Sequence, residues 1–224
     1  MLTKYGSDVL WKYFALILFT SICVGVFVHN GAAEYSLFLA LALITLFVLN
    51  FFRDPARTPP VGAGILVSPA DGKVVAITET FEQEYLHDRA MQVSVFMSPL
   101  DVHVNRIPID GTIGYFRYIK GEYLVAFDDK SSERNERTHI GVENEGYKVL
   151  FKQIAGAVAR RIVADVTPGQ QVRLGEKFGM IKFGSRVDIL MPKSSEILVR
   201  LNDRVTAGET IIARYQPVTG NPVS

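Results

Sequence analysis

The chain has 224 residues, a formal net charge of +1 and charged side chains at 21% of its positions. A chain this close to neutral has no global basic field, so charge gives no argument for nucleic-acid binding. The single cysteine, Cys23, excludes an internal disulfide, and the four histidines are too scattered for metal-ligand spacing, so we expect no metal site.

Two long apolar runs open the chain, at residues 13–28 and 35–52, and neither contains a charged side chain. Each is close to the roughly 20 residues that a helix needs to cross the hydrocarbon layer of a membrane. The connection between them, "HNGAAE", is short, which favours a helical hairpin. We predict that residues 1–56 form a membrane-anchoring helical hairpin. Because the first run is short, a hairpin that only re-enters the membrane remains the alternative.

The basic residues around these runs indicate an orientation. Lys4 and Lys12 precede the first run and Arg53 and Arg57 follow the second, whereas the connecting loop has no Lys or Arg. The positive-inside rule therefore places both ends of the hairpin in the cytoplasm. A cleaved signal peptide is disfavoured because a second apolar run follows the first instead of a soluble mature chain.

A proline-rich segment, "RDPARTPP" at residues 53–60, ends the apolar region and predicts a stiff boundary. From there to the end, short runs rich in Val, Ile and Phe alternate with Gly, Pro and Asp turns, which is typical of β-strands. Only residues 153–165, "QIAGAVARRIVAD", allow a short helix, and their Val and Ile content also allows a strand. We predict a β-rich domain at residues 57–224.

A weak internal repeat refines this fold prediction. The segments "DVTPGQQVRLGE" and "NDRVTAGETIIA" share an Asp, a Val, a Gly and a following apolar strand. Biotinyl and lipoyl carrier domains use similar Val-x-x-Gly turns. The predicted fold class is mainly β, a barrel/sandwich hybrid related to biotinyl- and lipoyl-like folds, preceded by the membrane hairpin. Ordinary hairpin turns are the simpler explanation of the repeat.

The segment "GMIKFGSRVDI", residues 179–189, interrupts an apolar alternation with Gly184 and Ser185. A β-bulge that carries a small polar residue is the ordinary interpretation. The alternative is chemical, because a glycine has no Cβ to hinder attack on its own carbonyl. Attack by Ser185 Oγ on that carbonyl would give an ester, and β-elimination followed by hydrolysis would leave a pyruvoyl group. The residues alone leave both interpretations open.

Six motifs occur in one order between residues 51 and 190: "FFRDPARTPP", "SPADGKV", "FMSPLDVHVNRIPIDGTI", "NERTHI", "QIAGAVARRIV" and "GMIKFGSRVDI". Together they resemble the short bacterial phosphatidylserine decarboxylase proenzymes, a pyruvoyl-dependent family. The resemblance implies that Ser185 becomes the pyruvoyl cofactor and that the cleavage site is Gly184–Ser185. It implies a larger chain, residues 1–184, and a smaller chain, residues 185–224, that remain associated.

The resemblance also implies a catalytic set of Ser185, His103 and Asp71. In the long branch of the family an Asp-His-Ser triad performs the self-cleavage, and its aspartate matches Asp71. The two-histidine motif matches "DVHVNR", whose first histidine position is His103 and whose triad position is Arg106. Arginine stays protonated in proteins and is no general base. We therefore expect His103 to activate Ser185 with Asp71 orienting it, and His139 is the alternative base.

The implied reaction converts phosphatidylserine to phosphatidylethanolamine at the bacterial inner membrane. A pyruvoyl carbonyl forms a Schiff base with the serine amino group and accepts electrons as carbon dioxide leaves. His103 is the candidate acid that protonates the resulting carbanion. Lys182, Arg186 and Arg137 are candidate substrate-binding cations for the lipid phosphate and carboxylate, and a salt-bridge role is equally open for each.

Other functions remain open from the sequence. The substrate is archaetidylserine in one alternative, and another pyruvoyl decarboxylase is a second. A non-enzyme, a membrane-tethered biotinyl-like adaptor, would need a modifiable lysine at a hairpin tip, for which Lys73 in "DGKVV" is a poor match. Exposed β edges make a homodimer a further expectation.

Overall fold

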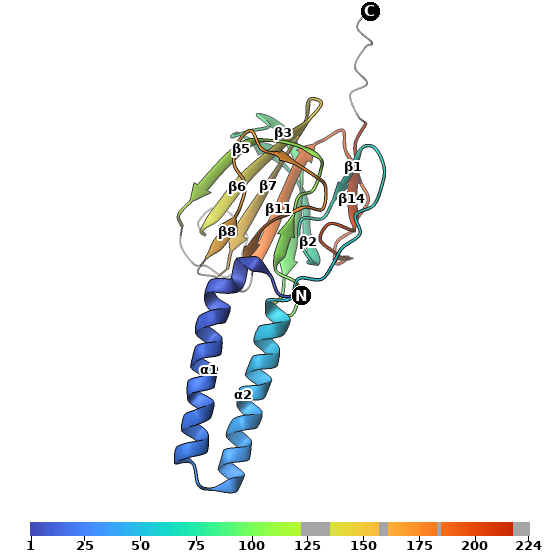
Figure 1. Cartoon of the computed structure of the whole chain (residues 1–224). Helices are drawn as coiled ribbons and strands as arrows, with labels where there is room; N and C mark the ends of the chain where they lie inside the picture. Colours follow the sequence, from blue (N-terminus) through green and yellow to red (C-terminus); the bar gives the residue numbers. More distant parts are fainter. Residues whose placement is uncertain (122–134, 157–160, 183–184, 217–224) are drawn as a thin grey trace, which may run out of the picture. The chain divides into compact units, whose positions relative to one another are not determined.

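The computed structural model describes residues 1–121, 135–156, 161–182 and 185–216. The chain divides into two compact units, Met1–Pro55 and Ala56–Ser224 (Figure 1). The first unit is helical and the second is built from strands, so each is described by itself.

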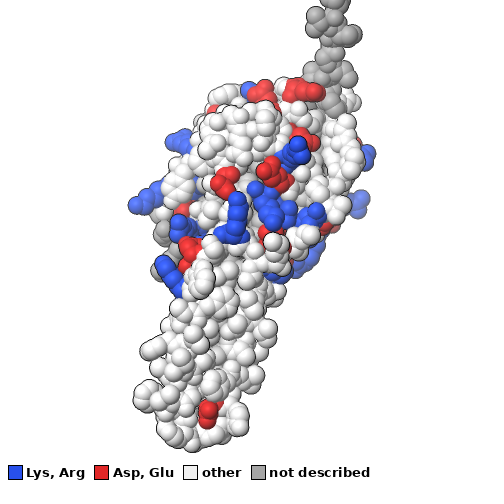
Figure 2. Space-filling model, in the orientation of Figure 1, with Lys and Arg blue, Asp and Glu red and all other residues white. Residues whose placement is uncertain are grey.

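The helical unit consists of a short 3-10 turn η1 (Lys4–Gly6) and two helices, α1 (Ser7–Phe27) and α2 (Gly31–Phe51). Each helix has 21 residues and therefore spans roughly 32 Å, close to the thickness of the hydrocarbon layer. Both are long and apolar enough to cross a membrane. Figure 2 shows few charged side chains on them. The predicted helical pair is confirmed, and its insertion across the membrane stays a prediction.

The polar side chains inside these helices are satisfied locally. The hydroxyls of Thr20 and Ser21 each donate to the carbonyl four residues earlier, at 2.9 and 2.8 Å. Tyr13 and Thr45 join the two helices through a hydroxyl contact of 2.6 Å. Because a membrane interior offers no water to polar groups, these contacts suit the helices to it.

The second unit is mainly β, as predicted, and all its strand pairs in the described residues are antiparallel. Eight strands form one curled sheet in the order β13-β2-β3-β11-β7-β6-β5-β9, and two three-stranded sheets have the orders β1-β14-β12 and β4-β10-β8 (Figure 1). The strands are β1 (Ile65–Val67), β2 (Gly72–Glu82), β3 (Asp88–Met97), β4 (Val104–Arg106), β5 (Gly111–Ile119), β6 (Arg137–Asn144), β7 (Tyr147–Ala155), β8 (Ile162–Ala164), β9 (Gln171–Val172), β10 (Lys177–Ile181), β11 (Ser185–Pro192), β12 (Glu196–Ile197), β13 (Arg204–Val205) and β14 (Ile211–Arg214).

The hydrophobic core fills the space between the curled sheet and the small sheets. Phe151 on β7 and Phe178 on β10 are both fully buried, and their rings meet edge to face with centroids 5.1 Å apart. This contact joins the large sheet to the sheet that contains β10. Alternate residues of β11, such as Val187 and Ile189, point into the same core.

The segment "GMIKFGSRVDI" is not one interrupted strand. β10 ends at Ile181 and pairs with β4 and β8, whereas β11 begins at Ser185 and pairs with β3 and β7. The chain therefore passes from a small sheet to the large one at this point, which excludes a bulge within a single strand. Gly184 lies outside the described residues.

The two repeated segments form two loops that meet each other. Gly175 and Gly208 have φ values of +78° and +75°, which favour glycine, and each follows a buried valine by three residues. A Cβ added to Gly208 would lie 3.3 Å from Gly175 Cα and 2.8 Å from Arg106 Cδ. Arg106 Nη1 donates to the Gly175 carbonyl at 2.9 Å. Arg106 thus links the two loops, a structural role that explains an arginine at this position.

Candidate active site

Ser185 is the first residue of β11 and is fully buried. Its register partners are Met97 on β3 and Ala155 on β7. Ser185 Oγ donates to Met97 Sδ at 3.4 Å. A thioether is a weak acceptor, so little hydrogen-bond energy is lost when this hydroxyl turns to another acceptor.

His103 lies in the loop between β3 and β4 and is also fully buried. Its Nδ1 is 2.9 Å from the backbone carbonyl of Asp101. A carbonyl only accepts, so Nδ1 carries a proton, and in the neutral ring the lone pair lies on Nε2. The Asp101 carboxylate holds the loop, because it accepts from Ser98 N–H and pairs with Arg204, each at 2.8 Å. The fold thus gives His103 the tautomer that a base acting through Nε2 needs.

Asp71 lies beside this loop, in a cluster of its own. Its carboxylate contacts Arg57 Nη2 and the Ala207 N–H, both at 2.7 Å, and Arg57 also pairs with Glu209 at 3.3 Å. Burial raises the pKa of Asp71, although the Ala207 N–H and Arg57 act in the opposite direction; the nearby charge of Asp101 adds to the rise. A raised carboxyl pKa suits acid–base chemistry. The predicted action of Asp71 on His103 stays a prediction.

A chain of buried amides ends at the sulfur that Ser185 contacts. Thr138 Oγ1 donates to Gln153 Oε1 at 2.7 Å, and Gln153 Nε2 donates to Asn105 Oδ1 at 2.9 Å. Asn105 Nδ2 in turn lies 3.8 Å from Met97 Sδ. None of these side chains is more than 1% exposed. These four residues lie on four different strands, and no spacing in the sequence links them, so they could not be identified from the sequence.

Asn135 fixes the strand next to Ser185. Its Nδ2 donates to the Ala155 carbonyl at 2.6 Å, and the Ala155 N–H donates to the Glu136 carbonyl at 2.9 Å. Glu136 Oε1 accepts from the Tyr118 hydroxyl at 3.0 Å. The "NERTHI" motif therefore holds the end of β7 beside Ser185.

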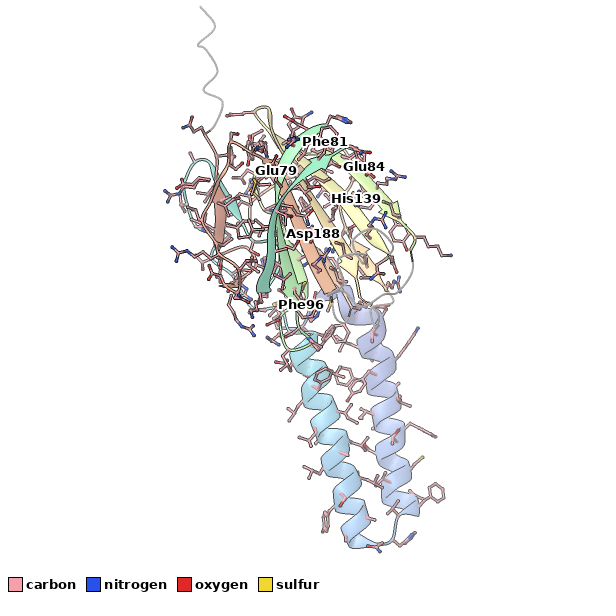
Figure 3. The ribbon with its side chains drawn as sticks, turned by 180° about the vertical axis from the view of Figure 1, so that it is seen from behind. Glu79, Phe81, Glu84, Phe96, His139 and Asp188 are labelled. Carbon is pink, nitrogen blue, oxygen red and sulfur yellow. The ribbon has the colours of Figure 1, made fainter. Side chains whose placement is uncertain are left out.

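The predicted substrate-binding cations are placed differently from one another. Side chains alternate along a strand, so Arg186 faces the side of the sheet opposite to Ser185. There its Nε lies 2.9 Å from Asp188 Oδ1, and both side chains are buried (Figure 3 labels Asp188). This pairing favours a structural role for Arg186.

Arg137 shares a face of the sheet with Arg186. Both residues are register partners of Ile154, one on each side of β7. Arg137 Nη1 donates to the Asn135 carbonyl at 3.1 Å. Lys182 belongs to neither strand: it is buried after β10, and its N–H donates to the Arg161 carbonyl at 3.2 Å. The sequence alone gave no reason to separate these three cations.

His139, the alternative base, lies on the face of the sheet that carries Arg137 and Arg186. There it hydrogen-bonds to Glu84, and Figure 3 labels both residues. Its Nδ1 is 2.7 Å from Glu84 Oε2, and Glu84 also accepts from the Tyr115 hydroxyl at 2.9 Å. Burial lowers the pKa of His139. Burial alone would raise the pKa of Glu84, but hydrogen bonds from His139 and Tyr115 lower it overall. This environment suits a structural histidine.

A His139→Gln variant is expected to lose part of the protein's acid sensitivity. His139 with a lowered pKa is neutral in the folded state, while the unfolded chain binds a proton below about pH 6.5. Folded stability therefore falls as pH drops through this range, and the Glu84 carboxylate titrates at lower pH. Between pH 7.5 and 5.5 the melting temperature in detergent should fall less for the variant than for the wild type. Equal falls would contradict this account.

Comparisons with known proteins agree with the resemblance found in the motifs. The sequence profile of the family described as phosphatidylserine decarboxylase matches residues 44–213. The phosphatidylserine decarboxylase proenzyme of Prosthecochloris aestuarii is 44% identical over 219 residues, which cover 98% of this chain and 100% of that protein. The proenzymes of Amoebophilus asiaticus and Salinibacter ruber are 45% identical over 90% of each chain and 52% identical over 75% of each chain.

Proposed function

The chain belongs to the phosphatidylserine decarboxylase family, and from this premise we propose that it converts phosphatidylserine to phosphatidylethanolamine with a pyruvoyl group made from its own Ser185. It is a carboxy-lyase. The observation that carries the proposal is the position of Ser185: it is buried, it begins β11 where the chain changes sheets, and it contacts only a weak acceptor through Oγ among the described residues.

The proposed self-cleavage needs only groups of the chain and water. Ser185 Oγ adds to the Gly184 carbonyl carbon while His103 Nε2 accepts the hydroxyl proton. The C–N bond then breaks, the serine nitrogen takes up a proton, and an ester remains. Loss of the Ser185 α-proton expels the Gly184 carboxylate, and water hydrolyses the resulting dehydroalanine with release of ammonia. The products are chains 1–184 and 185–224.

The surroundings of Ser185 fit the group that this reaction leaves. Conversion removes the hydroxyl oxygen and turns Cβ into a methyl group. Met97 and Ala155, the two register partners of Ser185, offer the apolar contacts that a methyl group needs. The pyruvoyl group supplies an electron-accepting carbonyl for decarboxylation. We propose His103 as the acid that delivers a proton to the former α-carbon of the lipid serine.

Arg137 and Lys182 are the proposed contacts of the lipid phosphate and carboxylate. Arg137 already donates to the Asn135 carbonyl and lies on the face of the sheet opposite to Ser185, so Lys182 is the stronger candidate of the two. Arg186 is the weaker candidate, because Asp188 already neutralises it. Archaetidylserine is the alternative substrate, since these cations would recognise the same headgroup on a different lipid.

The helical unit supports a site at a membrane surface. A two-tailed lipid barely dissolves in water, so an enzyme that acts on it benefits from an anchor such as α1 and α2. We propose that the hairpin sits in a bacterial inner membrane with the β-rich unit on the cytoplasmic side, following the positive-inside rule. A homodimer is part of the proposal. The adaptor alternative is weakened because Lys73 lies within β2, paired with Phe96, and not at a hairpin tip.

The test is the intact mass of the purified wild-type protein, together with an assay on phosphatidylserine vesicles. We expect two chains that split between residues 184 and 185, a smaller chain with a blocked pyruvoyl start, and release of carbon dioxide. Vesicles of an archaetidylserine would be turned over less well. Full activity of a single uncleaved chain would refute the proposal, and a modified Lys73 without decarboxylation would favour the adaptor.

A further inference from the structure

The buried amide chain has a direction that two backbone carbonyls fix. Gln153 Nε2 lies 3.4 Å from the Val163 carbonyl, and a carbonyl only accepts. Gln153 therefore presents its nitrogen to Asn105 and its oxygen to Thr138. Independently, the Pro69 carbonyl lies 3.4 Å from Asn105 Nδ2. Both amides thus have one orientation, in which the Asn105 N–H groups point toward Met97 Sδ and Pro69.

The two ends of the Asn105 amide are held very differently. Its oxygen accepts from Gln153 at 2.9 Å, an ordinary hydrogen bond. Among the described residues, its nitrogen contacts a carbonyl at 3.4 Å and a sulfur at 3.8 Å, and both contacts are long. Asn105 is fully buried, so donors this poorly matched cost stability. The amide chain imposes that cost, because the hydrogen bond from Gln153 fixes the orientation of the Asn105 amide.

The Asn105 amide nitrogen and the Ser185 hydroxyl both contact the same atom, the sulfur of Met97. Met97 Sδ accepts from Ser185 Oγ at 3.4 Å and lies 3.8 Å from Asn105 Nδ2. A preorganised donor next to a reacting group is worth most where negative charge develops in a water-free site. In self-cleavage that charge forms when the electrons of the attacked carbonyl move onto its oxygen.

We propose that Asn105 is a catalytic residue of self-cleavage, whose Nδ2 donates a hydrogen bond to the oxyanion formed when Ser185 Oγ attacks, and that Gln153 and Thr138 are positioning residues. The inference rests on the self-cleavage proposed above. Asn105 neither gains nor loses a proton in the step. His103 takes the hydroxyl proton, and the oxyanion collapses when the C–N bond breaks.

The experiment follows self-cleavage of the full chain, freshly made by cell-free translation in the presence of phospholipid nanodiscs, on denaturing gels. Asn105→Asp is isosteric and still accepts from Gln153, but its carboxylate cannot donate. At pH 8 it should slow cleavage at least about 100-fold, the usual cost of losing one oxyanion donor. Thr138→Val removes only the hydrogen bond to Gln153, at the end of the amide chain far from Ser185. It should slow cleavage by about 3- to 10-fold, or roughly 1 kcal/mol.

The pH profile separates catalysis from structure. A protonated carboxyl group regains one O–H donor, so the ratio of the Asn105→Asp rate to the wild-type rate should rise as pH falls through the carboxyl pKa. The ratio removes any pH effect on His103 that both proteins share. Asn144→Asp, the same substitution at the end of β6, should cleave at the wild-type rate at every pH.

The results distinguish this inference from the proposed function. A wild-type chain that stays uncleaved refutes the proposed function. A wild-type chain that splits while Asn105→Asp splits equally fast, or with a ratio that does not change with pH, refutes the role of Asn105. Melting temperatures identify a variant that does not fold. In that case Thr138→Val decides, because wild-type cleavage by that variant would also overturn the proposal.

Discussion

A Ser185→Ala protein is expected to remain one chain of 224 residues and to release no carbon dioxide from phosphatidylserine. The substitution removes the proposed nucleophile of self-cleavage and, with it, the atoms from which the proposed pyruvoyl cofactor would be made. The fold should persist, because the lost hydroxyl contacts only the Met97 thioether among the described residues. Activity should drop by at least about 10³-fold, the scale on which removal of a catalytic nucleophile acts. Intact mass and a carbon dioxide release assay measure both effects.

Ser195→Ala is the matched control for this variant. Ser195 belongs to the same proposed smaller chain, is also buried, and hydrogen-bonds to the Tyr147 hydroxyl at 2.7 Å. It should lose some stability yet still split and decarboxylate. Ser185→Cys should split slowly through a thioester, since it keeps a nucleophile at the same position. A Ser185→Ala chain that still splits between residues 184 and 185 would show that another group starts the reaction.

His103→Ala is expected to slow self-cleavage by about 10²- to 10⁴-fold, the contribution typical of a general base. The Asp101 carbonyl holds the proton on His103 Nδ1, so the variant loses a base whose tautomer the backbone has set. A time course of chain splitting after cell-free synthesis measures the rate. Added imidazole should restore part of it, because the substitution leaves a cavity of the ring's own shape.

His139→Gln provides the comparison between the two histidines. His139 Nδ1 is bonded to Glu84 on the face of the sheet opposite to Ser185, so this variant should split at the wild-type rate. If His139→Gln remained whole and His103→Ala split normally, the assignment of the base would be reversed. The double variant should behave like His103→Ala alone.

Local patterns in the sequence predicted the helical pair and the mainly β body, because apolar run length and strand–turn alternation are local properties. The partners of Ser185 could not be predicted in this way. Met97 lies 88 residues away along the chain, and pairing between strands depends on the whole sheet. Only the fold shows that Asn105 and Gln153 meet, and that Asn105 lies against the Met97 sulfur that Ser185 contacts.

The arginines show why residue type alone was a poor guide to role. Arg106 stands where the resemblance to the longer relatives implies a histidine, and no pattern in the sequence explains the difference. In the fold it binds the Gly175 carbonyl between two glycine loops, where a long cationic side chain fits. Arg186 was expected near the substrate because it follows Ser185. The alternation of side chains places it on the opposite face, with Asp188 as its partner.

The position of β11 has a consequence for the life of the enzyme. All eight of its residues pair with β3 and six pair with β7, so the proposed smaller chain would supply an interior strand of the large sheet. If the proposed cleavage occurs, its fragments cannot part without unfolding. A pyruvoyl group built into that strand would be neither taken up from solution nor lost by dialysis, and each polypeptide would make it once. Chemical damage to it would then be repaired only by synthesis of a new protein.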